Sequence, residues 1–161
     1  MRSTRKCRLV LNPPKHRVFK PTGIPADMLE EITLTIDEYE AIRLADFEEF
    51  DQLEASKRMG ISRPTFTRLI QKARKKVSSF LIESKSLIIE GGNIHFKQDL
   101  VECTKCGTRI KVDFEKKETV CPECGSTAFV SIAEQYGHGR CCRNRGGNNG
   151  NEPGHGHGRN K

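Results

Sequence analysis

Residues 51–84 constrain the fold of this chain more than any other part, and read DQLEASKRMGISRPTFTRLIQKARKKVSSFLIES. Asp51, with Glu54 three residues later, resembles a capping box and predicts the start of a short helix. Gly60 then predicts a tight turn. Ser62 is a good N-cap for a second, longer helix, which we expect to span residues 63–85.

The second helix carries an apolar face and a basic face. Pro64 falls in its first turn, where the amide has no helical partner in any case. Apolar side chains recur at helical spacing: Phe66, Leu69, Ile70, Ala73, Val77, Phe80 and Leu81. Basic side chains lie off this face: Arg63, Arg68, Lys72, Lys75 and Lys76. Together these features predict a helix-turn-helix that places its second helix in the major groove of DNA. An ordinary helical hairpin with a solvated charged face is the alternative.

Charge is segregated along the chain. Lys and Arg outnumber Asp and Glu by 28 to 21. Residues 1–20 carry seven basic residues and no acid, and residues 63–76 carry six more, whereas residues 27–54 hold eleven acids and one Arg. This segregation puts positive potential where phosphates would lie, although a charge run alone is more often a solvated face. We expect residues 1–22 to form a disordered basic arm in which Arg5, Lys6 and Arg8 follow a phosphate backbone or enter a minor groove.

A second motif lies nearer the C-terminus. Cys103, Cys106, Cys121 and Cys124 form two C-x-x-C pairs separated by fourteen residues, and a glycine follows each pair. Four thiolates complete a tetrahedral metal shell, so this spacing predicts one zinc ion per chain. Iron in the same four-sulfur geometry, as in rubredoxin, is the main alternative. No segment resembles a secretory signal, so we expect a cytoplasmic protein whose thiols stay reduced, which disfavours disulfides.

The flanking sequence fits a small β-ribbon that ends in a polar tail. Ile110, Val112 and Phe114 alternate with polar residues, and a second short run covers residues 128–133. The Gly-, Asn- and Arg-rich segment after it is too polar to bury a core and should be disordered. Cys141 and Cys142, with the histidines of this tail, leave loose metal capture open beside a passive solvated role.

The chain has room for one small helical domain and one metal-stapled module. A first helix should begin after Thr35, with Glu38 completing a capping box, and run through Asp46. The expected fold is therefore a mainly α helix-turn-helix domain plus a small β zinc-ribbon, with a disordered arm and tail. Its expected divisions are a basic arm 1–22, the helical domain 23–92, a linker 93–100, the ribbon 101–133 and a tail 134–161.

Several motifs resemble one family. KPTGIP, LTIDEYEAIRLADFE, KRMGISRPTF and ARKKV, ending in GG at 91–92, are similar to the family called domain of unknown function 134, or uncharacterised protein family 0251. The resemblance covers about residues 5–92 and implies a DNA-binding helix-turn-helix similar to region 4 of sigma factors. By this resemblance Gly60 is the turn glycine, supported by Ile61, Phe66 and Leu69. It also implies that the exposed DNA-contacting positions are Ser62, Arg63, Thr65, Thr67, Arg68 and Gln71, which Lys72 joins by charge.

Two functional classes remain after this comparison. The leading one is a sequence-specific, double-stranded-DNA-binding transcriptional regulator whose ribbon is structural or senses metal or redox state. The alternative is a metal-binding adaptor or metallocofactor-assembly accessory protein that uses the ribbon to grip RNA polymerase or another protein. Four cysteines would saturate the metal and leave no position for an activated water, so we expect no enzymatic activity. No apolar run approaches the roughly 20 residues that span a bilayer. The oligomeric state stays open, with a homodimer as one option.

Overall fold

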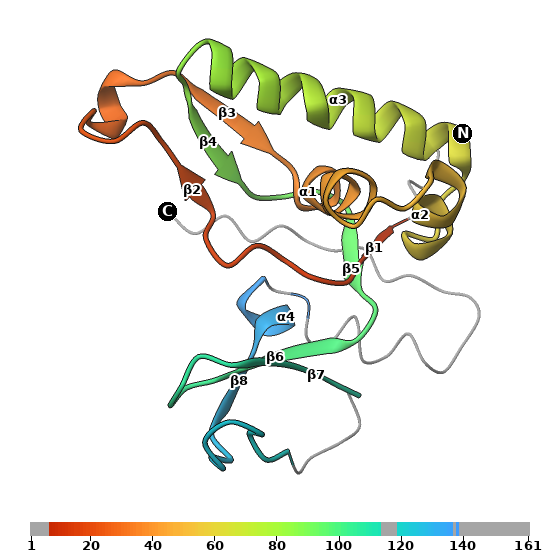
Figure 1. Cartoon of the computed structure of the whole chain (residues 1–161), viewed down its shortest axis with the longest axis vertical. Coiled ribbons are helices and arrows are strands. Elements are labelled where there is room, and N and C mark those ends of the chain that lie inside the picture. Colours follow the sequence, from red (N-terminus) through yellow and green to blue (C-terminus); the bar gives the residue numbers. More distant parts are fainter. Residues whose placement is uncertain (1–6, 114–118, 137, 139–161) are drawn as a thin grey trace.

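The computed structural model describes residues 7–113, 119–136 and 138 (Figure 1). Within these residues the chain forms four α-helices and eight strands, and the strands are arranged in three sheets. The expectation of a mainly α fold is therefore wrong. Most of the missed strands are two to four residues long, too short for a period-two pattern to appear in the sequence.

The segment expected to be a disordered arm contributes two strands. β1 (Arg8–Val10) pairs in parallel with β5 (Ile94–Phe96). β2 (Val18–Phe19) lies at the edge of a second sheet, antiparallel to the central strand β4 (Ser86–Ile89), and β3 (Glu31–Leu34) pairs with β4 in parallel. A short 3-10 turn, Ala26–Met28, precedes β3. Part of the span expected to be a linker, residues 93–100, is thus the strand β5.

The helices begin where the capping residues predict. Thr35 and Glu38 form the capping box of α1 (Ile36–Ile42), which continues as a π-helical segment, Arg43–Phe47. The Asp51 carboxylate accepts a 2.8 Å hydrogen bond from the Glu54 amide at the start of α2 (Gln52–Arg58). Ser62 caps α3 (Arg63–Ile82), with proline in its first turn. These local predictions are confirmed.

The apolar face of α3 is shorter than the sequence predicts. Phe66, Leu69, Ile70 and Ala73 are buried, and Val77 and Phe80 are partly buried, but Leu81 is 65% exposed. The helix ends at Ile82 instead of residue 85, because Ser84 takes a positive φ of 53° and the chain turns into β4. Within the described residues, no helix has both the length and the apolar character that crossing a bilayer would require.

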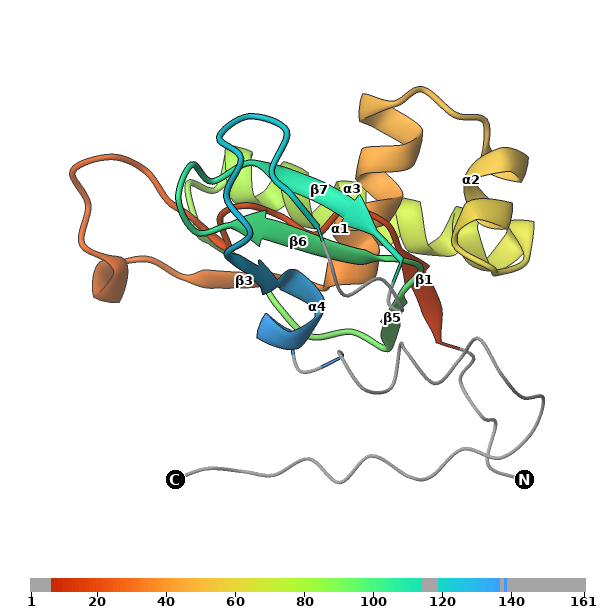
Figure 2. The same cartoon turned by 90° about the horizontal axis from the view of Figure 1, so that it is seen from below.

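The ribbon packs against the N-terminal body. Its central strand β6 (Asp99–Cys103) lies between β7 (Arg109–Val112) and β8 (Phe129–Ser131), all antiparallel. The short α4 (Ile132–Gln135) follows β8 (Figure 2), and Ala133 joins the core cluster that β1, β3, β4 and β5 form with α1 and α3. A second core cluster lies between α1, α2 and α3. The expectation that the chain becomes disordered at residue 134 is wrong for α4 and Tyr136, and residues 139–161 lie outside the described part.

Candidate functional site

The turn between α2 and α3 depends on Gly60. Its φ of +66° is in the left-handed region that L side chains rarely adopt. A Cβ added there would also lie 3.3 Å from Cδ1 of Leu9, so the turn is covered by the strand β1. The Leu9 amide donates to the carbonyl of Met59, at the end of α2, over 2.9 Å. The turn is thus held on the body by the N-terminal segment.

The two helices are also joined by side chains. Thr67 on α3 donates a 2.7 Å hydrogen bond to Gln52 Oε1 on α2. The Ser62 hydroxyl accepts from the Thr65 amide at 3.4 Å and lies 2.8 Å from the Thr65 hydroxyl. These contacts place three of the expected DNA-contacting residues, Ser62, Thr65 and Thr67, in positions where they fix the start of α3.

The six basic side chains of α3 divide into two groups. Three form ion pairs with acids of the preceding helical region. Lys76 lies 2.6 Å and Lys72 lies 3.5 Å from Glu38, and Arg74 lies 2.6 Å from Asp46. Within the described residues the other three, Arg63, Arg68 and Lys75, make no side-chain ion pair or hydrogen bond, and all are exposed.

Two of these three cations, Arg68 and Lys75, lie with Gln71 in a stripe on the outward side of α3. Arg68, Gln71 and Lys75 follow one another at spacings of three and four residues, so they share one helix face. This face is opposite the buried face and carries no acid. The sequence alone does not distinguish these cations from the paired ones, because the acids that pair with Lys72, Arg74 and Lys76 come from other elements of the fold.

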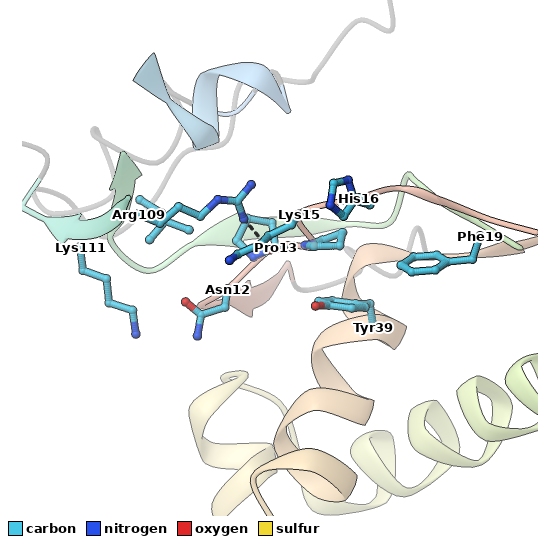
Figure 3. A pocket seen from close by; sticks show the side chains of 10 residues that line it. Asn12, Pro13, Lys15, His16, Phe19, Tyr39, Arg109 and Lys111 are labelled. Carbon is cyan, nitrogen blue, oxygen red and sulfur yellow. Dashed lines mark hydrogen bonds between the residues drawn. The ribbon is translucent and has the colours of Figure 1, made fainter. Parts of the chain in front are cut away.

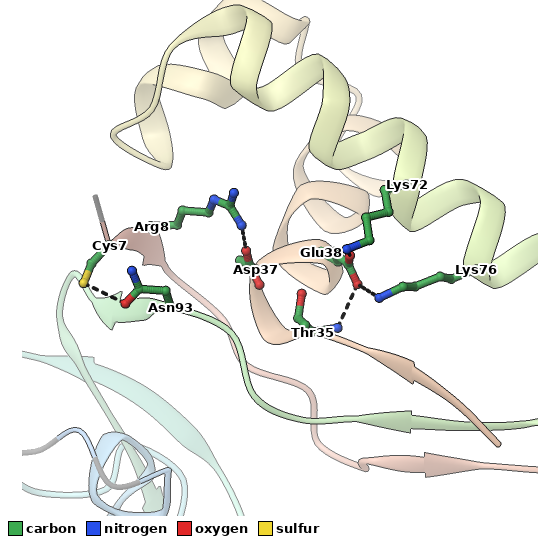
Figure 4. Close-up of polar contacts among 8 residues, drawn as sticks. All are labelled: Cys7, Arg8, Thr35, Asp37, Glu38, Lys72, Lys76 and Asn93. Atoms are coloured by element: carbon green, nitrogen blue, oxygen red, sulfur yellow. Dashed lines mark hydrogen bonds and ion pairs between the residues drawn. The ribbon is translucent and has the colours of Figure 1, made fainter. Parts of the chain in front are cut away.

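Arg8 is paired with a buried acid. Its guanidinium forms an ion pair with Asp37, whose side chain is 1% exposed (Figure 4). Beside it, the Glu38 carboxylate accepts a 2.9 Å hydrogen bond from the Thr35 amide as well as the contact with Lys76. The other two arm residues expected to contact DNA, Arg5 and Lys6, lie outside the described residues.

A cluster of buried acids around the start of α1 was not predicted from the sequence. Asp37, Glu38 and Glu40 are all nearly inaccessible, and Glu40 accepts from Leu11 and pairs with Arg43 at 2.9 Å. Gly92 makes the cluster possible, because a Cβ there would lie 2.5 Å from Oδ1 of Asp37. The signal was present as a run of acids around the start of a helix with apolar neighbours.

The four cysteines come together at one end of the ribbon. Each C-x-x-C pair forms the same turn. The Gly107 amide donates to the Cys103 carbonyl at 2.9 Å, and the Gly125 amide donates to the Cys121 carbonyl at the same distance. Cys103 and Cys121 are buried, whereas Cys106 is exposed.

The spacing of the sulfur atoms fits a single metal ion. All four Sγ atoms lie within 4.8 Å of one another, with Cys103 and Cys124 at 3.6 Å and Cys106 and Cys121 at 3.5 Å. Metal–sulfur bonds of about 2.3 Å in a tetrahedron separate sulfur atoms by roughly 3.8 Å. Hydrogen bonds with the side chain and backbone of Thr108 lower the pKa of the Cys106 thiol to about 6. The spacing of the four sulfur atoms therefore allows the cluster to hold a metal ion.

Together, the fold and these sites define a small protein of mixed α and β structure that joins a basic helical surface to a four-cysteine cluster. The chain belongs to the family described as "Protein of unknown function DUF134", whose model matches residues 1–97. The match ends before the first cysteine of the cluster.

Relatives extend this similarity over most of the chain. The chain is 46% identical to a UPF0251 protein of Chloroherpeton thalassium, covering 86% of this chain and 94% of the relative. It is 41% identical to a UPF0251 protein of Moorella thermoacetica, covering 85% of this chain and 90% of the relative. No solved structure matches significantly.

Proposed function

We propose that the chain is a sequence-specific DNA-binding protein, acting as a transcriptional regulator that reads the major groove with α3. The observation that carries this proposal is the exposed set of Arg63, Arg68 and Lys75 on α3, which have no side-chain partner among the described residues. Unpaired guanidinium groups on a helix can pair bidentately with guanine edges, and ammonium groups can contact phosphates.

The local geometry supports a helix-turn-helix. α2 and α3 are joined through the Gly60 turn, and the first turn of α3 is capped by Ser62. In such motifs the N-terminal residues of the second helix contact base edges. The likeness to region 4 of sigma factors belongs to the same proposal.

For the four-cysteine cluster we propose one structural zinc ion per chain, with iron as the alternative. Four thiolates fill the coordination shell of zinc and would staple two loops of the ribbon together. When bound, the ion would cross-link the Cys103 turn to the Cys121 turn.

The experiment compares two arginines of α3 that differ in their contacts. In the part of the chain that the structure describes, Arg68 has no side-chain partner, whereas Arg74 pairs with Asp46. DNA fragments bound by the full-length protein are selected from genomic DNA, and the affinity of each variant is measured for the enriched sequence and for a scrambled one. Arg68→Ala should weaken binding to the enriched sequence by about 1–3 kcal/mol and relax the preference at one base pair. Arg74→Ala should change the affinity for DNA little. Recovery of all genomic fragments without enrichment would contradict the proposal.

One observation favours the adaptor as a second candidate. Val120, next to the Cys121 turn, is 62% exposed, and Val130 on β8 is 38% exposed. Exposed apolar side chains on a metal-stapled ribbon fit contact with another protein, such as RNA polymerase. Val130→Lys would weaken co-purification of such a partner but leave DNA affinity unchanged, which separates the two candidates.

A further inference from the structure

A basic groove runs along the junction between the helical body and the ribbon. Its lining comes from the chain segment Asn12–Phe19, from β7, and from Tyr39 of α1, which lies on the same side as Phe19 (Figure 3). Its volume is about 500 Å³, within the range of roughly 300–1,000 Å³ that small-molecule sites occupy. An adjoining pocket of about 420 Å³ shares Lys15, His16 and Arg109 and reaches Tyr136.

The charge of the groove is of one sign. The described residues that line the two pockets include the basic side chains of Lys15, His16, Arg17, Arg109 and Lys111, and none of the lining residues is acidic. Within the described residues, the side chains of Lys15, His16 and Lys111 have no ion-pair partner. Arg109 pairs with Glu102 at 2.7 Å, so the charge of its guanidinium is partly compensated. A concave surface that carries two lysines without an ion-pair partner among the described residues attracts an anion.

Aromatic rings stand beside these cations. Figure 3 shows Phe19 and Tyr39 on one side of the groove, with Arg109 and Lys111 on the other. Phe19 is 43% exposed, although it is a large apolar residue on a two-residue strand. In the adjoining pocket Arg17 lies over the Tyr136 ring, 5.2 Å from its centroid. An open aromatic face next to positive charge suits a ligand that has both a planar ring and an anionic group.

The walls of the groove are held in place by two contacts between the body and the ribbon. Arg109 Nη1 donates to the Pro13 carbonyl, and the Tyr136 hydroxyl donates to the Pro14 carbonyl, each over 3.3 Å. Proline fixes φ in this segment, so its carbonyls are presented in a rigid arrangement. A ligand in the groove would therefore contact both parts of the protein at once.

We propose that this junction groove binds a free nucleotide, with its phosphate held by Lys15 and Lys111 and its base against Phe19 and Tyr39. The groove is separate from the outward face of α3, because α3 and the ribbon lie on opposite sides of α1 (Figure 1). Binding is thus independent of the DNA-binding proposal, and it would stabilise the docking of the ribbon on the body.

Titration calorimetry on the full-length protein tests the groove with adenosine 5′-monophosphate, adenosine and inorganic phosphate as probes. We expect saturable binding of the nucleotide, weaker binding of the other two, and a rise in the melting temperature with nucleotide concentration. Comparable affinity for inorganic phosphate and the nucleotide would overturn the proposal. Binding of a single-stranded oligonucleotide without binding of the mononucleotide would also overturn it.

Charge-matched variants localise the site. Lys15→Gln with Lys111→Gln should weaken nucleotide binding by about tenfold or more, because charge-assisted contacts are lost. Lys57→Gln with Lys97→Gln removes the same charge from exposed positions outside the groove and should leave affinity unchanged. Phe19→Leu should reduce the preference for the nucleotide over ribose 5-phosphate. Equal affinities of the two double variants would place the nucleotide elsewhere and overturn the proposal.

Discussion

Lys76 donates a 2.6 Å hydrogen bond to Glu38, a carboxylate that is almost wholly buried at the start of α1. The adjacent Lys75 is exposed and has no partner among the described residues. Two neighbouring lysines of one basic helix therefore have different surroundings. One joins α3 to α1, and the other is available to a ligand.

This difference predicts opposite effects of two identical substitutions. Lys76→Met leaves a buried carboxylate with weaker compensation from Lys72, so we expect a loss of about 2 kcal/mol in the free energy of unfolding. Lys75→Met should change stability by less than about 0.5 kcal/mol and weaken DNA binding instead. Urea unfolding and DNA titration measure both. Equal losses of stability would show that Lys76 is not a structural cation.

The two consecutive glycines predict a second matched pair. Both have positive φ, +70° at Gly91 and +102° at Gly92, but only at Gly92 would a Cβ meet a neighbour, Asp37 Oδ1. Gly91→Ala should cost about 1–2 kcal/mol for backbone strain alone. Gly92→Ala should cost clearly more, because it also displaces the Asp37 carboxylate that pairs with Arg8. Thermal unfolding of the two variants side by side tests this order, and a smaller loss for Gly92→Ala would refute it.

We expect loss of the metal to unfold the ribbon but not the helical body. Apparent binding energies of structural zinc sites are about 10–16 kcal/mol near neutral pH, so Cys121→Ser should release the metal and unfold the ribbon. The helical body has its own core cluster between α1, α2 and α3 and should stay folded, although it loses the packing of Ala133. Elemental analysis gives the metal content, and amide NMR spectra report the two regions. Cys7→Ser, outside the cluster, is the control and should retain one metal per chain.

The N-terminal charges predict a change in salt dependence. Removing residues 2–6 deletes Arg2, Arg5 and Lys6 but leaves β1 intact. If these residues contact phosphates, the slope of log affinity against log salt should become shallower by about 2–3. A longer deletion to residue 20 is unsuitable because it removes β1 and β2. An unchanged slope for the short deletion would assign the phosphate contacts to α3 alone.

The starts of the helices and the cysteine turns depend on neighbouring residues, so they could be predicted from the sequence. The pairing of strands that are far apart in the chain could not. The Asp51 and Ser62 caps each act on an amide three residues away, so they can be read from the sequence itself. The pairing of Arg8–Val10 with Ile94–Phe96 joins segments from opposite ends of the body, and neither has enough residues to show strand alternation. The ion pair between Arg8 and Asp37 depends on that same pairing of strands. For this reason a basic segment resembled a free arm.

The pairing of β1 with β5 also bears on when the protein can fold during synthesis. The strand that covers the Gly60 turn is translated well before its partner, which is not made until residue 94. Until then the ribosome holds a nascent chain whose first strand has an unsatisfied edge, and contacts of such long sequence separation form slowly. The helices can form early, but the pairing of β1 with β5, which holds β1 over the Gly60 turn, forms late. Slowing translation before residue 94 should therefore prolong exposure of this segment to chaperones and proteases.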